Sequence, residues 1–189
     1  MDALMAALVA ALFIHTTDKT PWRAAMLGAR FADKAEIVGG MVLGMAIGNA
    51  VSAAGGMLIA PRMTPEARSL FVAVALASAG VGAILPLKKP RALPSDTRLG
   101  AFGASLVATL ALALGDRTQF MTAALAARSP IPWLAPFGAV TGGAIIAIAA
   151  LAIGEKRLGG LPVTAIRAAI GVVLTIAGVA IGLSALRLI

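Results

Sequence analysis

Apolar residues dominate four long stretches of the chain, each bounded by charged or turn-forming residues. A helix that crosses the hydrocarbon core of a bilayer needs about 20 mostly apolar residues. The stretches at 37–60, 67–87, 132–154 and 161–186 all reach that length. The pattern therefore predicts four transmembrane helices.

Two further apolar segments are interrupted by short polar runs. The first covers 1–14, breaks at His15–Arg23 (HTTDKTPWR) and resumes as AAMLGARF. The second covers 99–115, breaks at Asp116–Gln119 (DRTQ) and resumes as FMTAALAAR. Because neither apolar piece crosses comfortably alone, we expect spans one and four to be interrupted helices. The fold class expected is an all-α integral membrane protein with six transmembrane helices.

The composition agrees with a bilayer environment. Of 189 residues, 60% are hydrophobic and 13% are charged, and the mean hydropathy is +0.96, far above an ordinary soluble domain. The net charge of +8 would suggest nucleic acid in a soluble protein, but the bases lie between apolar runs, so we expect the lipid bilayer as partner and no nucleic acid. The absence of cysteine excludes disulfides and thiolate metal sites, so we expect a bound metal to use oxygen or nitrogen ligands.

The loops between the expected spans differ in positive charge. Loops after spans one, three and five hold nine Lys and Arg residues, and the opposite side holds four. Since cytoplasmic loops carry the excess, we expect a multi-pass protein of the cell inner (plasma) membrane with both termini outside the cytoplasm. The nine are Arg30, Lys34, Lys88, Lys89, Arg91, Arg98, Lys156, Arg157 and Arg167, the four are Arg62, Arg68, Arg128 and Arg187, and Lys19, Arg23 and Arg117 are expected inside the membrane.

The chain contains an internal repeat at an offset of 98 residues. At this offset Asp18–Arg30 (DKTPWRAAMLGAR) aligns with Asp116–Arg128 (DRTQFMTAALAAR), with six identities in thirteen positions. The register continues without a gap into the next span, where Gly40 meets Gly138. Chance similarity between two apolar helices would not align the Asp-basic-Thr triplets as well.

The polar linker Leu87–Arg98, with two prolines and five charged residues, divides the two copies. We therefore expect three-helix repeats at 1–90 and 91–189. Because three is odd, the second repeat enters the membrane from the opposite side. Inverted repeats with broken helices are typical of transporters whose site lies near the midplane, at the repeat interface.

The candidate chemistry lies in the two breaks. An unpaired carboxylate in hydrocarbon costs about 2.5–3.5 kcal/mol even on a lenient scale, so Asp18 and Asp116 need compensation. In one interpretation they form structural ion pairs, the first with Lys19 or Arg23 and the second with Arg117. In the interpretation that we favour, they bind a cation or carry protons.

Five further polar residues accompany the aspartates. The hydroxyls of Thr20 and Thr118 can bind a cation or cap the following half-helix, and Gln119 can donate or accept. His15 lies three residues before the first aspartate and suits proton coupling, although a lone histidine is more often a packing residue. Asn49, alone among apolar neighbours, is either a link between helices or a ligand.

The doubled motif resembles a known family. The segments TDKT with LGARF, and LGDRTQ with ALAAR, resemble the paired Glu-x-Gly-Asp-[Lys/Arg]-[Thr/Ser] motifs of uncharacterised protein family 0016, the transmembrane protein 165 family of divalent cation/proton exchangers. The resemblance covers essentially the whole chain. It implies exchange of manganese or calcium for protons, with Asp18 and Asp116 as metal ligands or proton carriers. Supporting polar groups would then be Thr20, Thr118, Gln119, Asn49, Lys19 and Arg117.

The chain departs from the family pattern at three positions, which indicates a divergent member with degenerate motifs. His15 and Ala113 stand where the pattern has glutamate, and Thr17 replaces the first glycine. Hard dications prefer several charged oxygens, whereas histidine favours manganese or a later transition metal. We therefore expect no resident cofactor, a transported cation that is manganese rather than calcium, and a monomer or homodimer.

Three other functions remain open from the sequence. The bases Lys19, Arg23 and Arg117 suit export of a small anionic or zwitterionic solute, bound at half-helix N-termini. The tripeptide Leu114–Asp116 is similar to the Gly-x-Gly-Asp motif of intramembrane aspartyl proteases, but Ala113 departs from it and such an enzyme does not need symmetric aspartates. A purely structural role applies if both aspartates are fixed in ion pairs. The expectation is a secondary transporter and not an enzyme.

Overall fold

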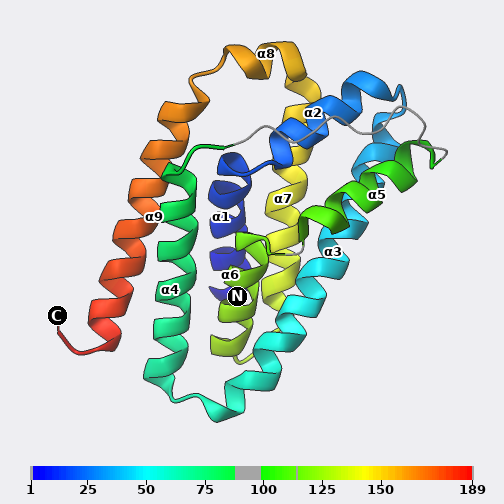
Figure 1. The fold of residues 1–189 in the computed structure, drawn as a ribbon. Coiled ribbons are helices and arrows are strands. Elements are labelled where there is room, and N and C mark those ends of the chain that lie inside the picture. The colour runs from blue at the N-terminus through cyan, green and yellow to red at the C-terminus, as the bar shows by residue number, and fades with distance from the viewer. Residues whose placement is uncertain (1, 88–98, 114, 189) are drawn as a thin grey trace.

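The computed structural model describes residues 2–87, 99–113 and 115–188, and these residues form helices with no strand among them. This confirms the expected all-helical class (Figure 1). The elements are α1 (Asp2–Thr17), α2 (Thr20–Arg30), α3 (Lys34–Ile59), the 3₁₀ turn η1 (Ala60–Arg62), α4 (Pro65–Ile84), α5 (Gly100–Ala113), α6 (Arg117–Arg128), α7 (Leu134–Ile153), α8 (Glu155–Gly160) and α9 (Val163–Ala185).

Four helices are long and apolar enough to cross a membrane. They are α3 together with η1, α4, α7 and α9, and they coincide with the four uninterrupted stretches of the sequence to within a few residues. Helices α1 and α5 are apolar but shorter. The four predicted spans are therefore confirmed as helices of membrane-crossing length.

Both predicted interruptions are present. Helix α1 ends at Thr17 and α2 begins at Thr20, while α5 ends at Ala113 and α6 begins at Arg117. In each case an aspartate carboxylate accepts a hydrogen bond from a backbone N–H at the start of the second helix. Such a side chain satisfies an N–H group that has no partner within the helix, so it fixes where the second helix starts.

The helices form one bundle in which the two sequence halves interleave (Figure 1). Helices α4 and α9 pack together along one side, α1 packs along α7, and α3 packs against α5 and α6. Both termini and the α3–α4 connection lie at one end of the bundle, and α2 and α8 lie at the other. The two helix breaks therefore lie between these ends.

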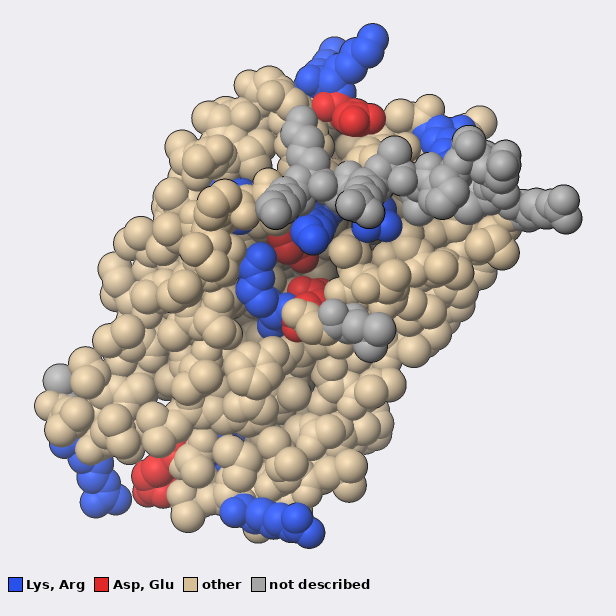
Figure 2. All heavy atoms as spheres, in the orientation of Figure 1, with Lys and Arg blue, Asp and Glu red and all other residues tan. Residues whose placement is uncertain are grey.

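Charged side chains gather at the two ends and in one hollow between them. Figure 2 shows Lys and Arg at both ends and a mixed acidic and basic group partway along the bundle. The linker bases Lys88, Lys89, Arg91 and Arg98 lie outside the described residues, and so does the boundary between 1–90 and 91–189.

Glycines allow two helix pairs to approach closely. A Cβ added at Gly138 on α7 would collide with the main chain of Leu4 on α1, and one added at Gly40 on α3 would collide with the main chain of Phe102 on α5. The two contacts are related by the offset of 98 in both partners. Each half therefore packs its interrupted helix against the first long helix of the other half.

This packing predicts a strong difference between two glycine positions. Gly138→Ala places a methyl group against the Leu4 backbone, and overpacking of this kind costs about 1–3 kcal/mol. Gly55→Ala is the control, because a Cβ there meets nothing within 4 Å. Thermal unfolding in detergent micelles should show a lower midpoint for the first variant and no loss for the second. Equal midpoints would contradict the close approach of α1 and α7.

Candidate functional site

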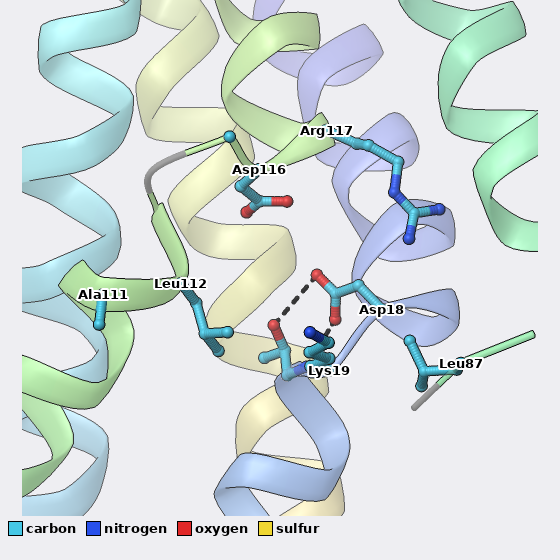
Figure 3. Close-up of a pocket in the computed structure, with 9 residues that line it drawn as sticks. Asp18, Lys19, Leu87, Ala111, Leu112, Asp116 and Arg117 are labelled. Atoms are coloured by element: carbon cyan, nitrogen blue, oxygen red, sulfur yellow. Dashed lines mark hydrogen bonds between the residues drawn. The ribbon is translucent and has the colours of Figure 1, made fainter. Parts of the chain in front are cut away.

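The two helix breaks bring three titratable side chains together. Asp18 follows α1 and Asp116 precedes α6, and the two carboxylates face the same space (Figure 3). One ligand atom each from His15, Asp18 and Asp116 lies within 4.8 Å of the others. The three residues singled out from the sequence for transport or proton coupling, 101 positions apart at the extremes, are therefore neighbours.

A cavity of about 300 Å³ opens beside the two aspartates. Its polar lining comes from Asp18, Lys19, Thr20, Asp116 and Arg117, and its apolar lining comes largely from α5. The mixed acidic and basic group in the hollow of Figure 2 lies at this position. The cavity is large enough for an ion with part of its hydration shell.

Asp18 is restrained by its own motif. Its Oδ1 accepts from the backbone N–H of Thr20 at 2.6 Å, and its Oδ2 accepts from the Thr20 hydroxyl at 3.1 Å. The same Oδ2 lies 2.9 Å from Nδ1 of His15. Lys19 is the N-cap residue of α2 but its side chain accepts no cap bond, so Asp18 supplies the acceptor for the first N–H of the helix. The hydroxyl of Thr20 helps to orient the carboxylate.

Asp116 is less restrained than Asp18. Its Oδ1 accepts from the backbone N–H of Thr118 at 3.2 Å, and the described residues make no second hydrogen bond to its carboxylate. Gly115 before it has φ +89°, a conformation that glycine adopts readily and that turns the chain into α6. The Thr118 hydroxyl is buried and has no hydrogen-bond partner in the described part of the chain. Asp116 is thus the carboxylate with more free acceptor capacity.

The motif bases do not form ion pairs with the motif acids among the described residues. The titratable side chain that contacts Asp18 is His15. Arg117 instead donates from its guanidinium to the carbonyl of Ala79 on α4 at 3.2 Å. Lys19 is exposed and lines the cavity. Direct pairing within each motif, the basis of the structural interpretation, is therefore absent from the described contacts.

Asn49 and Gln119 connect α3 to α6 beside the aspartates. Asn49 accepts from the hydroxyl of Thr122 at 2.7 Å and donates to the carbonyl of Met45 at 2.9 Å. The hydroxyl of Ser52 lies 3.3 Å from Oε1 of Gln119. Asn49 is therefore a link between helices. Thr122 was not singled out from the sequence, although its place one helical turn after Thr118 on the same face is a signal that points to it.

From the sequence we count Arg167 among the loop bases, but the structure places it inside a helix. It is not a loop residue: it lies on α9 with 6% of its surface exposed. Its Nε donates to the carbonyl of Thr17 and its NH2 to the carbonyl of Leu85, both at 2.8 Å. These carbonyls end α1 and follow α4, where helix carbonyls lack partners and carry partial negative charge. The guanidinium thus links the end of α1 and the residue that follows α4 to α9, next to the first motif.

Comparison with known protein families gives a match to the second half of the chain. Residues 101–188 match the family model described as divalent cation/proton antiporter GDT1. This segment runs from α5 to α9 and contains Asp116, whereas His15 and Asp18 precede it. No curated protein and no solved structure matches the chain significantly. The match agrees with the resemblance that the paired motifs indicate.

The bonds of Arg167 predict a large effect of its removal. Arg167→Met keeps the apolar stem but leaves the carbonyls of Thr17 and Leu85 without this donor, the first of them buried, and hydrogen bonds to charged groups contribute about 1.5–3 kcal/mol each. We expect a clear fall in the thermal unfolding midpoint in detergent. Arg157→Met on α8, an exposed position, is the matched control and should change the free energy of unfolding by no more than about 0.5 kcal/mol. Two variants of equal stability would show that these bonds contribute nothing.

Proposed function

We propose that this chain, which its second half assigns to the divalent cation/proton antiporter GDT1 family, exchanges a divalent cation for protons at the cavity between Asp18 and Asp116. One observation carries the proposal: two carboxylates from two separate helix breaks, far apart in the sequence, face the same cavity. The family is one of transporters and not of enzymes, so the site is interpreted as a place of binding and release.

The closeness of the two carboxylates supports an antiport mechanism. Two ionised carboxylates this close in a site of low dielectric constant repel each other, and a bound dication or a proton relieves that repulsion. The oxygen that takes up a proton no longer offers its charge to a metal. Occupancy by the cation and by the proton is therefore mutually exclusive, which is the requirement for exchanging one for the other.

The donor set favours manganese over calcium. Calcium takes 6–8 oxygen ligands, several of them charged, but the described cluster has two carboxylates and one imidazole. Imidazole is a good ligand for transition metals and a poor one for calcium. We therefore propose a manganese-like ion as the substrate.

Alternating access follows from an inverted repeat of 1–90 and 91–189, with each interrupted helix counted as one span of six. The contacts between α4 and α9 support this symmetry, like those of Gly40 and Gly138. A Cβ at Gly80 would meet Gly171 and Thr175, and a Cβ at Gly178 would meet Ala73 and Ala77, all shifted by 98. Asp18 and Asp116 belong to different halves, so rocking one half against the other changes their exposure.

The distribution of positive charge among the loops favours one orientation in the membrane, and from it one direction of cation flux. With nine loop bases on one side and four on the other in the sequence, and Arg167 moved from loop to helix, the excess still favours a cytoplasmic linker. We propose that the protein lies in the inner membrane of the cell, and both termini then lie outside the cytoplasm. The proposed flux is export of the cation from the cytoplasm.

One observation favours a second function, export of a small zwitterionic or anionic solute. Lys19 and Arg117 line the same cavity as the two aspartates, so that its charged groups balance. Arg23 is not among the lining residues, and its Nε is buried without a partner in the described chain. Metals and small metabolites must therefore be compared in the same transport assay.

The cation proposal predicts the behaviour of an aspartate double variant. Asp18→Asn with Asp116→Asn removes both charges and keeps side chains that still cap the half-helices. In proteoliposomes loaded with a pH-sensitive dye, we expect manganese to drive proton flux through the original protein, and the double variant to lose at least 90% of it, a change of about 1.4 kcal/mol or more in the barrier. Asp33→Asn is the matched control, because Asp33 caps α3 away from the cavity.

Two outcomes of the same assay would contradict the cation proposal. Full flux in the double variant would show that the carboxylates do not carry the exchange. Absence of flux with manganese, calcium and zinc, together with counterflow of a zwitterionic solute, would replace the cation proposal by the second function.

A further inference from the structure

The imidazole of His15 has one nitrogen that the site described so far does not use. The side chain is buried, with 2% of its surface exposed. Its Nδ1 lies 2.9 Å from Asp18 and 3.1 Å from the hydroxyl of Thr20. Its Nε2 is buried and has no hydrogen-bond partner among the described residues. A buried nitrogen without a partner costs free energy unless something binds to it.

The hydrogen bond of Nδ1 determines what Nε2 can do. An ionised Asp18 only accepts, so the proton of a neutral imidazole lies on Nδ1. Nε2 then presents a lone pair. Histidines that bind metals in proteins have this arrangement, with the second nitrogen donating to a carboxylate that fixes the ring and raises its basicity. Asp18 thus prepares His15 as a ligand.

Nε2 and a methionine sulfur lie close to the same glycine. A Cβ added at Gly143 on α7 would lie 2.9 Å from Nε2 of His15 and 2.6 Å from the sulfur of Met45. Both atoms therefore lie against Gly143, and the absence of a side chain there leaves room for them. The two residues also line a cavity of about 20 Å³, together with Asn49, Gln119 and Asp116. This volume suits one water molecule or one bare ion.

We propose that this inner cavity is a second binding position for the transported ion, with His15 Nε2, Met45 Sδ and Asp116 as its ligands. It rests on the divalent cation exchange proposed above, and its nitrogen and sulfur ligands move the preferred ion from manganese to a borderline or soft transition-metal dication of the zinc type. Nitrogen and thioether ligands bind such ions and bind calcium and magnesium poorly. The outer cavity offers oxygen ligands and admits the hydrated ion, and the inner cavity selects among the ions admitted.

Asp116 connects the two positions. It is the only carboxylate that lines both the outer and the inner cavity among the described residues. Its freer oxygens allow it to remain bound while an ion exchanges water for His15 and Met45. Thr20 and Leu112 are the other residues common to both linings, so the two cavities adjoin.

Metal binding to the purified protein in detergent tests this proposal without depending on transport. Isothermal titration calorimetry would compare zinc with calcium in the original protein and in Met45→Leu, a substitution that keeps side-chain volume. We expect zinc affinity to fall at least about tenfold and calcium affinity to stay the same. Met121→Leu is the matched control, since Met121 is equally buried and lines neither cavity.

A second variant should shift the metal preference from zinc toward calcium. His15→Glu restores the glutamate of the family pattern and replaces a nitrogen ligand by a charged oxygen. We expect calcium to bind at least about tenfold more tightly relative to zinc than in the original protein. A ratio unchanged by this substitution would exclude His15 as a ligand.

X-ray absorption at the zinc edge gives the direct readout. The chain has eight methionines and no cysteine, so a sulfur neighbour of bound zinc can only be a methionine. We expect that neighbour in the original protein and in Met121→Leu, and not in Met45→Leu. Zinc bound without sulfur, or no zinc binding at all, would overturn the inner site.

The outcomes separate this inference from the proposed function. If manganese drives proton flux but Met45→Leu leaves the zinc-to-calcium affinity ratio unchanged, the exchanger stands and the inner site is wrong. If zinc binds with a sulfur neighbour but no metal drives flux, the inner site stands and the exchange function is wrong. Thermal unfolding midpoints of each variant must match the original, which excludes misfolding as the cause of a lost ligand.

Discussion

A break in a helix at membrane depth leaves backbone groups without partners, and each costs several kcal/mol unless the protein supplies one. Asp18 and Asp116 meet that requirement by accepting from the backbone N–H groups of Thr20 and Thr118. The same two residues line the cavity. The interaction that ends one helix and begins the next therefore also positions the charged groups, and the rest of the site is arranged around these two caps.

The caps meet because the helices that carry them pack closely. Gly40 and Gly138 let α5 and α1 lie against α3 and α7, main chain against main chain. Small residues are the usual means of close packing in a membrane, where lipid provides no hydrophobic drive for helices to associate. Since each interrupted helix packs on the opposite half, the two breaks are brought to the same level of the bundle.

Bases contribute to this arrangement through carbonyls and not through carboxylates. Arg117 and Arg167, both in the second half, donate to Ala79, Leu85 and Thr17 in the first half. A guanidinium satisfies several carbonyls near helix ends at once, and the dipole of the helix favours a cation there. Within the described part of the chain, the two aspartates consequently have no arginine as an ion-pair partner, as the proposed cation site requires.

The two halves share a pattern of helices and glycines, but they differ in the polar and sulfur-containing side chains near the cavities. His15 has Ala113 as its counterpart at the offset of 98, and Met45 has Gly143. The second pair is also a contact, since the sulfur of Met45 occupies the space that a side chain at Gly143 would need. Similar helix contacts in the two halves thus hold different side chains, with the nitrogen and the sulfur of the proposed inner site both supplied by the first half.

The sequence by itself determined the helices, the two breaks, the offset of 98 and the pair of aspartates, because hydropathy period, helix caps and turn residues act over a few neighbouring positions. Only the tertiary structure decided the partners. It placed Arg167 against Thr17, 150 residues away, and Thr122 against Asn49, 73 residues away. It also turned the motif arginine toward a carbonyl of α4 and placed the sulfur of Met45 and Nε2 of His15 beside the same glycine, Gly143. Such contacts depend on how helices cross and rotate against one another, and no local pattern of residues encodes that geometry.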